Sequence, residues 1–455
     1  MPEKRTVDAG AAAASKRSPW ASLSYQQFRW LFASNQAFFF AMNGQFIVRS
    51  YLAFKLTDSA LALGVINLAV AVPMLLVSPF GGVIADRLER RKLIMASQFA
   101  LLLNEAIVLA LILGGVLAFW HLVAVTIVTG AIFPFMMPAR QAIVVDVVGK
   151  NGLGNAMALQ MGGMNAARVV APVLAGFLIY LVGVEWTYVV AIVLYLMALS
   201  AMTRVNPSRA IARAVGSTMR GEMAEGFRYV WQDRPVRALL LMGLIPITLM
   251  MPFQTLLVVF AEDVWDTGSR GLGILQGAAG VGGIVGSLAV AWRAKDPSMR
   301  VMLYSLFAFA GGLLFFAMSP WFLLGVAMVV FADVFIAMFQ TLNNTAINLI
   351  IPDHVRGRVM SMMMMTFGLT PLGTVPVSAA AEAFGAPVAV AGASVVSVVA
   401  VAGLMLWNRS LRLVDGLIAE NAENAVGPVP FSHGVSVAPA APAVPAAVPR
   451  GAPGS

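Results

Sequence analysis

The sequence contains no cysteine, only three histidines, and few charged residues for its length. Of its 455 residues, 11% are charged and 60% are hydrophobic, and the mean hydropathy is +0.84. The absence of cysteine excludes disulfide frameworks, thiol catalysis and thiolate metal sites. The histidines, His121, His354 and His433, are too scattered along the chain to suggest a metal site.

Such a composition excludes a water-soluble fold, because a chain of this length cannot bury so many apolar residues in one core. The net charge of +9 could suggest nucleic acid, but there is no soluble basic domain on which to build such a surface. The chain also lacks a nucleophile elbow, a phosphate-binding glycine loop and a metal ligand set. We therefore expect a protein of the lipid bilayer that is not an enzyme, with no cofactor, no metal and no nucleic-acid partner.

Twelve apolar runs are long enough to cross a bilayer, which takes about 20 residues each. They cover residues 28–49, 62–84, 93–117, 120–140, 157–182, 186–203, 238–260, 271–292, 301–318, 321–345, 359–381 and 386–407. A shift of the sequence by 204 residues superimposes Gly82 on Gly286, at the ends of the second and eighth runs. The pattern predicts an all-α membrane protein with twelve transmembrane helices in two pseudo-symmetric six-helix halves, residues 25–204 and 238–410. Duplicated halves of this kind often hold a substrate site between them.

The remaining segments are polar or of low complexity. Residues 1–24 and 411–455 are rich in alanine or proline and are expected to form disordered tails. Residues 205–237 are expected to contain an amphipathic helix at the membrane surface. All but four of the 30 lysines and arginines, among them Arg140, fall on the same side as the two tails, and the positive-inside rule then places both termini in the cytoplasm. The four exceptions are Arg49, Lys55, Arg168 and Arg270.

The stretch GGVIADRLERRK, residues 81–92, places an aspartate and four basic residues directly after the second apolar run. It matches the pattern G-x-x-x-D-R-x-x-R-R/K and resembles the loop signature of the major facilitator superfamily. The matching residues are Gly82, Asp86, Arg87, Arg90 and Arg91. Glu89 replaces the second glycine of the signature, which alters the loop turn.

Four further segments are similar to the subgroup that contains enterobactin exporters and macrolide efflux proteins, the transmembrane secretion effector type. They are EGFRYVWQDRPVR, PARQAIVVDVV, NAARVVAPVLAG and IPDHVRGRVMSM. The resemblance implies a monomeric secondary active transporter of the inner (plasma) membrane, which exports a small organic molecule by alternating access and is driven by protons. A non-transporting receptor or scaffold, and an importer of the same fold, are the alternatives.

The resemblance also implies a role for the charged loop. Asp86 would lie near the start of the eleventh span, and Arg90 would bridge it to Asp146 at the end of the fourth. The cluster is then expected to latch the two halves together on the cytoplasmic side, while Gly82 lets the second span approach a neighbouring helix. The alternative is that these charges only set the topology of the chain.

Three charged residues lie near the middle of apolar runs, where a charge costs at least about 2.5 kcal/mol. They are Glu105, Arg168 and Asp333, in the third, fifth and tenth runs. Either carboxylate could carry a proton, because dry surroundings disfavour its charged form and a nearby Arg168 favours that form again. The alternative is a buried ion pair that joins helices, with Arg168 in a packing role.

The first apolar run is more polar than a lipid-facing helix tolerates. Asn43 and Gln45 are expected to line the cavity and to form hydrogen bonds with a substrate. Arg49, near the end of the run, is expected to extend its side chain to the outer membrane surface.

Overall fold

The computed structural model describes residues 20–207, 228, 230–293, 298–351, 359, 369–407 and 416, and the described part of the chain is built from helices. The predicted all-α fold is thus confirmed. The helices are η1 (Ala21–Ser24), α2 (Gln26–Thr57), α3 (Ala60–Arg87), α4 (Arg90–Leu113), α5 (Phe119–Thr203), α7 (Arg234–Ile245), η2 (Pro246–Met250), α8 (Phe253–Val259), η3 (Phe260–Val264), α9 (Gly268–Arg293), α10 (Met299–Ala317), α11 (Phe322–Ile350), α13 (Pro371–Phe384) and α14 (Ala386–Trp407). The predicted tails and most of the predicted amphipathic helix lie outside the described residues.

The long helix α5 covers the fourth, fifth and sixth apolar runs. Its backbone is not helical at Gly149 (φ 69°) and Gly183 (φ 90°), and glycine adopts such positive φ values without a steric penalty. Nine helices of the described chain are long and apolar enough to cross a membrane, and one of them, Gly152–Thr203, has 52 residues. At a rise of about 1.5 Å per residue this helix is too long for a single crossing. The count of twelve spans stays a prediction.

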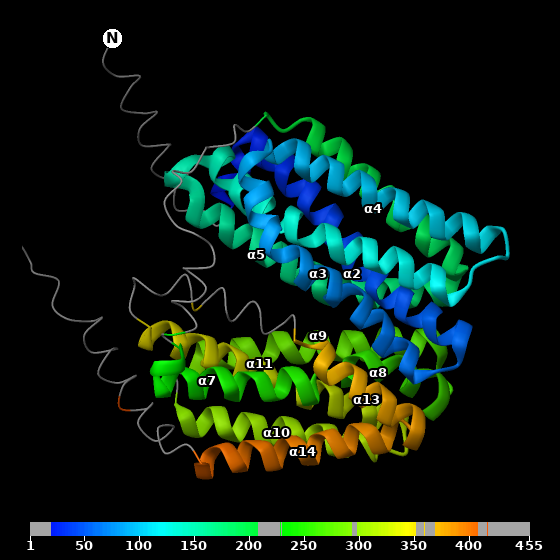
Figure 1. Ribbon diagram of the computed structural model, residues 1–455, viewed down its shortest axis with the longest axis vertical. Coiled ribbons are helices and arrows are strands. Elements are labelled where there is room, and N and C mark those ends of the chain that lie inside the picture. The colour runs from blue at the N-terminus through cyan, green and yellow to red at the C-terminus, as the bar shows by residue number, and fades with distance from the viewer. Residues whose placement is uncertain are drawn as a thin grey trace, which may run out of the picture.

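The helices form two bundles, α2–α5 and α7–α14 (Figure 1). The bundles come together at the end where α8 and α13 lie beside α3, and their ribbons diverge toward the other end (Figure 1). Across the boundary α3 contacts α13, α5 contacts α9, and α8 contacts both α2 and α3. In the described part of the chain the two bundles contact each other mainly at one end. The bounds of the two halves stay a prediction.

The two ends of the molecule differ in charge. One end, here called the basic end, contains the start of α4 and of α10 and the end of α5, with Arg90, Arg91, Lys92, Arg204 and Arg300. The opposite end, here called the acidic end, contains Asp58, Glu185, Glu262, Asp263 and Glu382. The bundles meet at the acidic end.

Exposed tryptophans mark both ends, as is usual at the two interfaces of a membrane. Each has more than half of its surface exposed. Trp20, Trp231 and Trp292 lie at the basic end, and Trp120, Trp186 and Trp321 lie at the acidic end. Between these two levels many large hydrophobic side chains are exposed, most of them leucine and valine. This arrangement fits a bundle that crosses a bilayer from one end to the other.

Glycine allows two helices of different bundles to touch. A Cβ atom on Gly176 of α5 would lie 2.6 Å from the Cα of Gly273 on α9, so the backbones are in direct contact, as small residues permit in membranes. Val169 and Val173 of α5 continue this contact along α9, against Gly280 and Gly277. These glycines therefore bring α5 and α9, and with them the two bundles, into direct contact.

Candidate functional site

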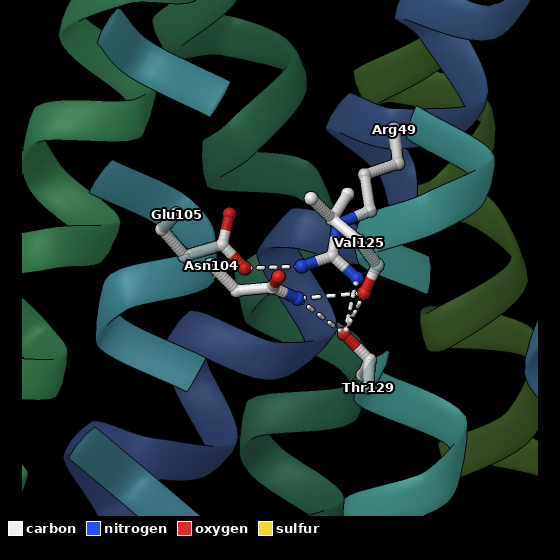
Figure 2. Close-up of polar contacts among 5 residues, drawn as sticks. All are labelled: Arg49, Asn104, Glu105, Val125 and Thr129. Atoms are coloured by element: carbon white, nitrogen blue, oxygen red, sulfur yellow. Dashed lines mark hydrogen bonds and ion pairs between the residues drawn. The ribbon is translucent and has the colours of Figure 1, made fainter. Parts of the chain in front are cut away.

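A buried ion pair joins α2 to α4 (Figure 2). Arg49 Nη2 donates to Glu105 Oε1, and Arg49 Nη1 donates to Thr129 Oγ1 over 3.0 Å. Arg49 is only 6% exposed and Glu105 is fully buried. The expectation that Arg49 reaches the outer surface is therefore wrong. Because α2 continues to Thr57, two turns beyond the apolar run, Arg49 lies inside the bundle.

The pair belongs to a network of hydrogen bonds within one half (Figure 2). Asn104 Nδ2 donates to Val125 O over 2.6 Å and to Thr129 Oγ1 over 3.1 Å. Glu105 Oε2 has no hydrogen-bond partner among the described residues. The network ties α2, α4 and α5 together, and the partner of Glu105 is Arg49 rather than Arg168. This geometry matches the alternative reading of Glu105 as part of an ion pair that joins helices.

Asp333 has a different environment. It lies on α11 and is 6% exposed, and its Oδ1 accepts a long hydrogen bond of 3.4 Å from Gln254 Nε2 of α8. Its Oδ2 has no partner among the described residues. Gly282 of α9 packs directly on it, since a Cβ there would lie 2.8 Å from the Cβ of Asp333. Asp333 is thus a buried carboxylate that forms no ion pair with any described residue.

Arg168 is an exposed residue in the middle of α5, in the other half. Its neighbour Val169 contacts Gly280 of α9, the same helix whose Gly282 packs on Asp333. The predicted alternative of a packing role does not fit its exposure, because the neighbouring Val169 makes the contact with α9. Arg168 and Asp333 thus belong to different halves, on helices that both pack against α9, while Glu105 is paired with Arg49.

Asn43 and Gln45 lie on nearly opposite sides of α2, as residues two apart on a helix do. Asn43 Nδ2 donates to Phe39 O of its own helix over 2.8 Å. Gln45 is buried, and its Oε1 has no partner among the described residues. It borders a cavity of about 70 Å³ between α2 and α5, with small residues such as Gly44 and Ala175 in its wall. The two amides therefore do not share one site.

At the basic end, Arg90 Nη1 lies 2.6 Å from Asp146 Oδ2, which links the start of α4 to α5. Arg91 Nη2 donates to Thr203 O over 2.7 Å. Both contacts stay within the first half. The side chains of Gly82, Asp86 and Arg87 lie outside the described residues, so the bridge from Arg90 to Asp86 stays a prediction.

Sequence reasoning missed several residues that the structure connects. Arg140, expected at the cytoplasmic end of the fourth apolar run, is buried within α5, where it donates to Asn35 Oδ1 and lies 3.9 Å above the ring of Phe38. At the acidic end Lys55 pairs with Glu262 of the other half.

Glu382 of α13 also joins the halves, because its Oε2 accepts from Ser59 Oγ over 2.9 Å and from Leu61 N over 3.2 Å. A carboxylate of one half thereby caps the first turn of α3 in the other. The acidic residues near the ends of the runs were the only signal in the sequence for these contacts.

Comparison with known proteins assigns the chain to a family. Residues 17–429 match the family model described as transmembrane secretion effector. The chain is 27% identical to the multidrug efflux pump Tap of Mycolicibacterium fortuitum, over 76% of this chain and 87% of that protein. It is 24% identical to the staphyloferrin A transporter of Staphylococcus aureus (72% and 82% covered), and 26% identical to the enterobactin exporter EntS of Escherichia coli (61% and 67% covered).

Solved structures show the same fold. The nucleoside transporter NupG has a TM-score of 0.67 at 13% identity, over 84% of this chain and 98% of that one. A bacterial homologue of the lysosomal transporter Spinster has a TM-score of 0.64 at 15% identity, over 87% and 97%. The chain therefore belongs to the transmembrane secretion effector family of the major facilitator superfamily, a family of multi-pass membrane transporters.

Proposed function

We propose that the protein exports a small organic molecule, drug-like or siderophore, across the inner membrane by alternating access, driven by protons. The family and the relatives support this, since one is named a multidrug efflux pump and another an enterobactin exporter. Transport requires neither a cofactor nor a second copy of the chain in this proposal.

The observation that carries the proton coupling is the contrast between the two membrane carboxylates. Glu105 has a fixed cationic partner in its own half, so its charge is balanced whatever the halves do. Among the described residues Asp333 has no ion pair and one oxygen without a partner, and it packs against α9, which also contacts α5, the helix of Arg168, in the other half. We assign the proton to Asp333 and the opposing charge to Arg168.

The conformation favours loading from the basic end, because the bundles meet at the acidic end and diverge toward the basic one (Figure 1). We place the basic end in the cytoplasm on the positive-inside rule, with both termini on that side. An exporter must collect its substrate there. The pair between Arg90 and Asp146 is already formed in this state, and Asp86 is proposed to join it when the basic end closes.

Substrate is proposed to bind between the halves, beside Arg168. Of the two amides of α2, only Asn43 remains a candidate for this site. Gln45 borders the separate cavity inside the first half.

Transport into inverted vesicles tests the proposal. Labelled enterobactin, staphyloferrin A and a macrolide would be offered to vesicles with and without an acid interior, comparing the native chain with Asp333→Asn, Glu105→Gln and Asp86→Asn. We expect uptake that needs the gradient in the native chain and in Glu105→Gln if that variant folds. Uptake should be lost in Asp333→Asn and slowed in Asp86→Asn.

The alternatives predict other results. Full transport by Asp333→Asn would show that the proton is carried by another group. Accumulation only in vesicles of native orientation would identify an importer. No movement of any compound in either orientation, from a protein that binds them, would favour a receptor.

A further inference from the structure

The seventh span is interrupted twice, unlike a regular helix. Between α7 and α8 lies the π-helical segment η2, and α8 ends in a second one, η3. Pro246 and Pro252 lack the backbone N–H that a regular α-helix needs, and Met251 N instead donates to Pro246 O, five residues back, over 2.7 Å. Segments of π-helix inside α-helices are frequent at functional sites. The interruptions isolate α8 as a short piece of helix.

Helix α8 lies at the boundary between the halves. It belongs to the second half but contacts α2 and α3 of the first (Figure 1). Successive residues on a helix point about 100° apart, so the neighbours Gln254 and Thr255 of α8 reach different partners. Thr255 Oγ1 lies 3.5 Å from Asn67 Nδ2 of α3, while Gln254 Nε2 donates to Asp333 Oδ1.

We propose that α8 links closure of the acidic end to the charge on Asp333, with Gln254 as the positioning residue. Asn67 holds Thr255 when the halves meet, and this holds Gln254 in reach of the carboxylate. The inference rests on the proposed function, since it takes Asp333 as the proton carrier. It adds the positioning residue Gln254 and the direction of proton movement to that function.

The direction follows from the chemistry of the hydrogen bond. An amide N–H that donates to a carboxylate stabilises its ionised form. With the acidic end closed, as in this structure, Gln254 therefore favours release of the proton toward the basic end. When α3 moves away, α8 loses Asn67, Gln254 loses its position, and Asp333 takes up a proton from the acidic end. Protons then move from the acidic to the basic end, opposite to an exported substrate.

The length of both hydrogen bonds fits a contact that is made and broken in each cycle. At 3.4 and 3.5 Å they are longer than the usual range. No other charged side chain occurs within α8 or α11, and those of α9 lie near its ends, at Arg270 and Arg293. Helices α7 and α10 also pack against α11, and their charges lie near their starts, at Arg234, Arg237 and Arg300. We therefore set Gln254, together with Arg168 of the proposed function, against the charge of Asp333.

Spin labels can test the link directly, because the chain has no cysteine of its own. The substitutions Val116→Cys and Met318→Cys introduce exposed labelling sites after α4 and α10, one in each half, at the acidic end. The distance between the labels in proteoliposomes reports the closed and open fractions at mildly acidic and mildly alkaline pH. The measurement requires no substrate.

We expect the closed-to-open ratio of the native chain to rise with pH, and Asp333→Asn to remove that response. Gln254→Leu should reduce the pH-dependent change in this ratio by about tenfold, the value of a hydrogen bond to a charged group. Asn67→Leu should do the same without touching Asp333. The matched control is Gln340→Leu on α11, whose amide contacts Met251 Sδ instead, and it should respond like the native chain.

Two results would overturn the reasoning at different points. A native pH response in Gln254→Leu, with none in Asp333→Asn, refutes the role of Gln254 and leaves the proposed function standing. A native response in Asp333→Asn refutes the choice of carboxylate itself. If Gln254→Leu does not fold, Gln254→Asn keeps the amide but shortens the side chain, and the same loss is expected.

Discussion

Removing one member of the Arg49–Glu105 pair should destabilise the first half far more than removing both. Arg49 and Glu105 are almost completely buried, so Arg49→Met leaves a carboxylate without its counter-charge in a dry environment. Breaking a buried pair in this way costs about 3–5 kcal/mol, whereas replacing both partners by apolar residues of similar size is often neutral. We expect the double variant Arg49→Met/Glu105→Leu to recover most of the loss.

The contacts of the pair refine this expectation. Arg49 also donates to Thr129, and the hydroxyl of Thr129 keeps its bond to Val125 O at 2.9 Å, so the double variant leaves the hydroxyl satisfied. Glu105→Gln keeps an acceptor for Arg49 but removes the charge, and should cost less than Arg49→Met.

Equilibrium unfolding in mixed micelles gives the free energies of unfolding of the native chain, Arg49→Met, Glu105→Leu and the double variant. The double-mutant cycle should give a coupling free energy of about 3 kcal/mol. If the single and double variants are equally unstable, the loss comes from packing, and the account of Glu105 as a structural pair is refuted. If Arg49→Met costs nothing, the carboxylate is not confined as described.

Three further results are expected. Gly176→Leu should prevent closure of the acidic end and abolish transport, because its side chain would collide with the α9 backbone. Gly283→Leu should be tolerated, since nothing lies within 4 Å of a Cβ at that position. The distance between the spin labels measures closure, and uptake into vesicles measures transport. Glu382→Gln should weaken the closed state by about 0.5–2 kcal/mol through loss of a charged helix cap, measured as a smaller closed fraction. Arg90→Ala should change the unfolding free energy by at most about 1 kcal/mol, since its bond to Asp146 is partly exposed, but should slow transport markedly.

Much of the fold could be predicted because a bilayer imposes length and apolarity on every spanning helix. The charged residues in the middle of apolar runs, Glu105, Arg168 and Asp333, could also be predicted as candidate sites, since a charge is costly in a membrane. The partner of Glu105 was not visible, because Arg49 lies 56 residues away and the helix extends past the apolar run that defined it. The end of an apolar run is a poor guide to the end of a helix when polar residues are buried.

The proposed role of Gln254 could not be predicted from the sequence, for a different reason. A single amide within an apolar run is inexpensive and carries no charge, so nothing in the local sequence distinguishes it from a neighbour such as Gln276. Its importance comes from a carboxylate 79 residues further along the chain and from the break of the helix at Pro246 and Pro252. Whether a residue lies at the boundary between the halves depends on the folded structure and cannot be read from its neighbours in the sequence.

That boundary is also the reason why we propose Asp333, and not Glu105, as the carboxylate that couples transport to protons. A group whose partners all belong to one half keeps its surroundings when the halves rock against each other, and Glu105 is such a group. Asp333 receives a hydrogen bond from α8, which touches the first half, and packs against Gly282 of α9, which contacts α5 of the first half. A site with contributions from both halves changes its hydrogen bonds and neighbouring charges when the halves move, and so changes its proton affinity. For this reason we expect Asp333 rather than Glu105 to link proton movement to the opening and closing of the two ends.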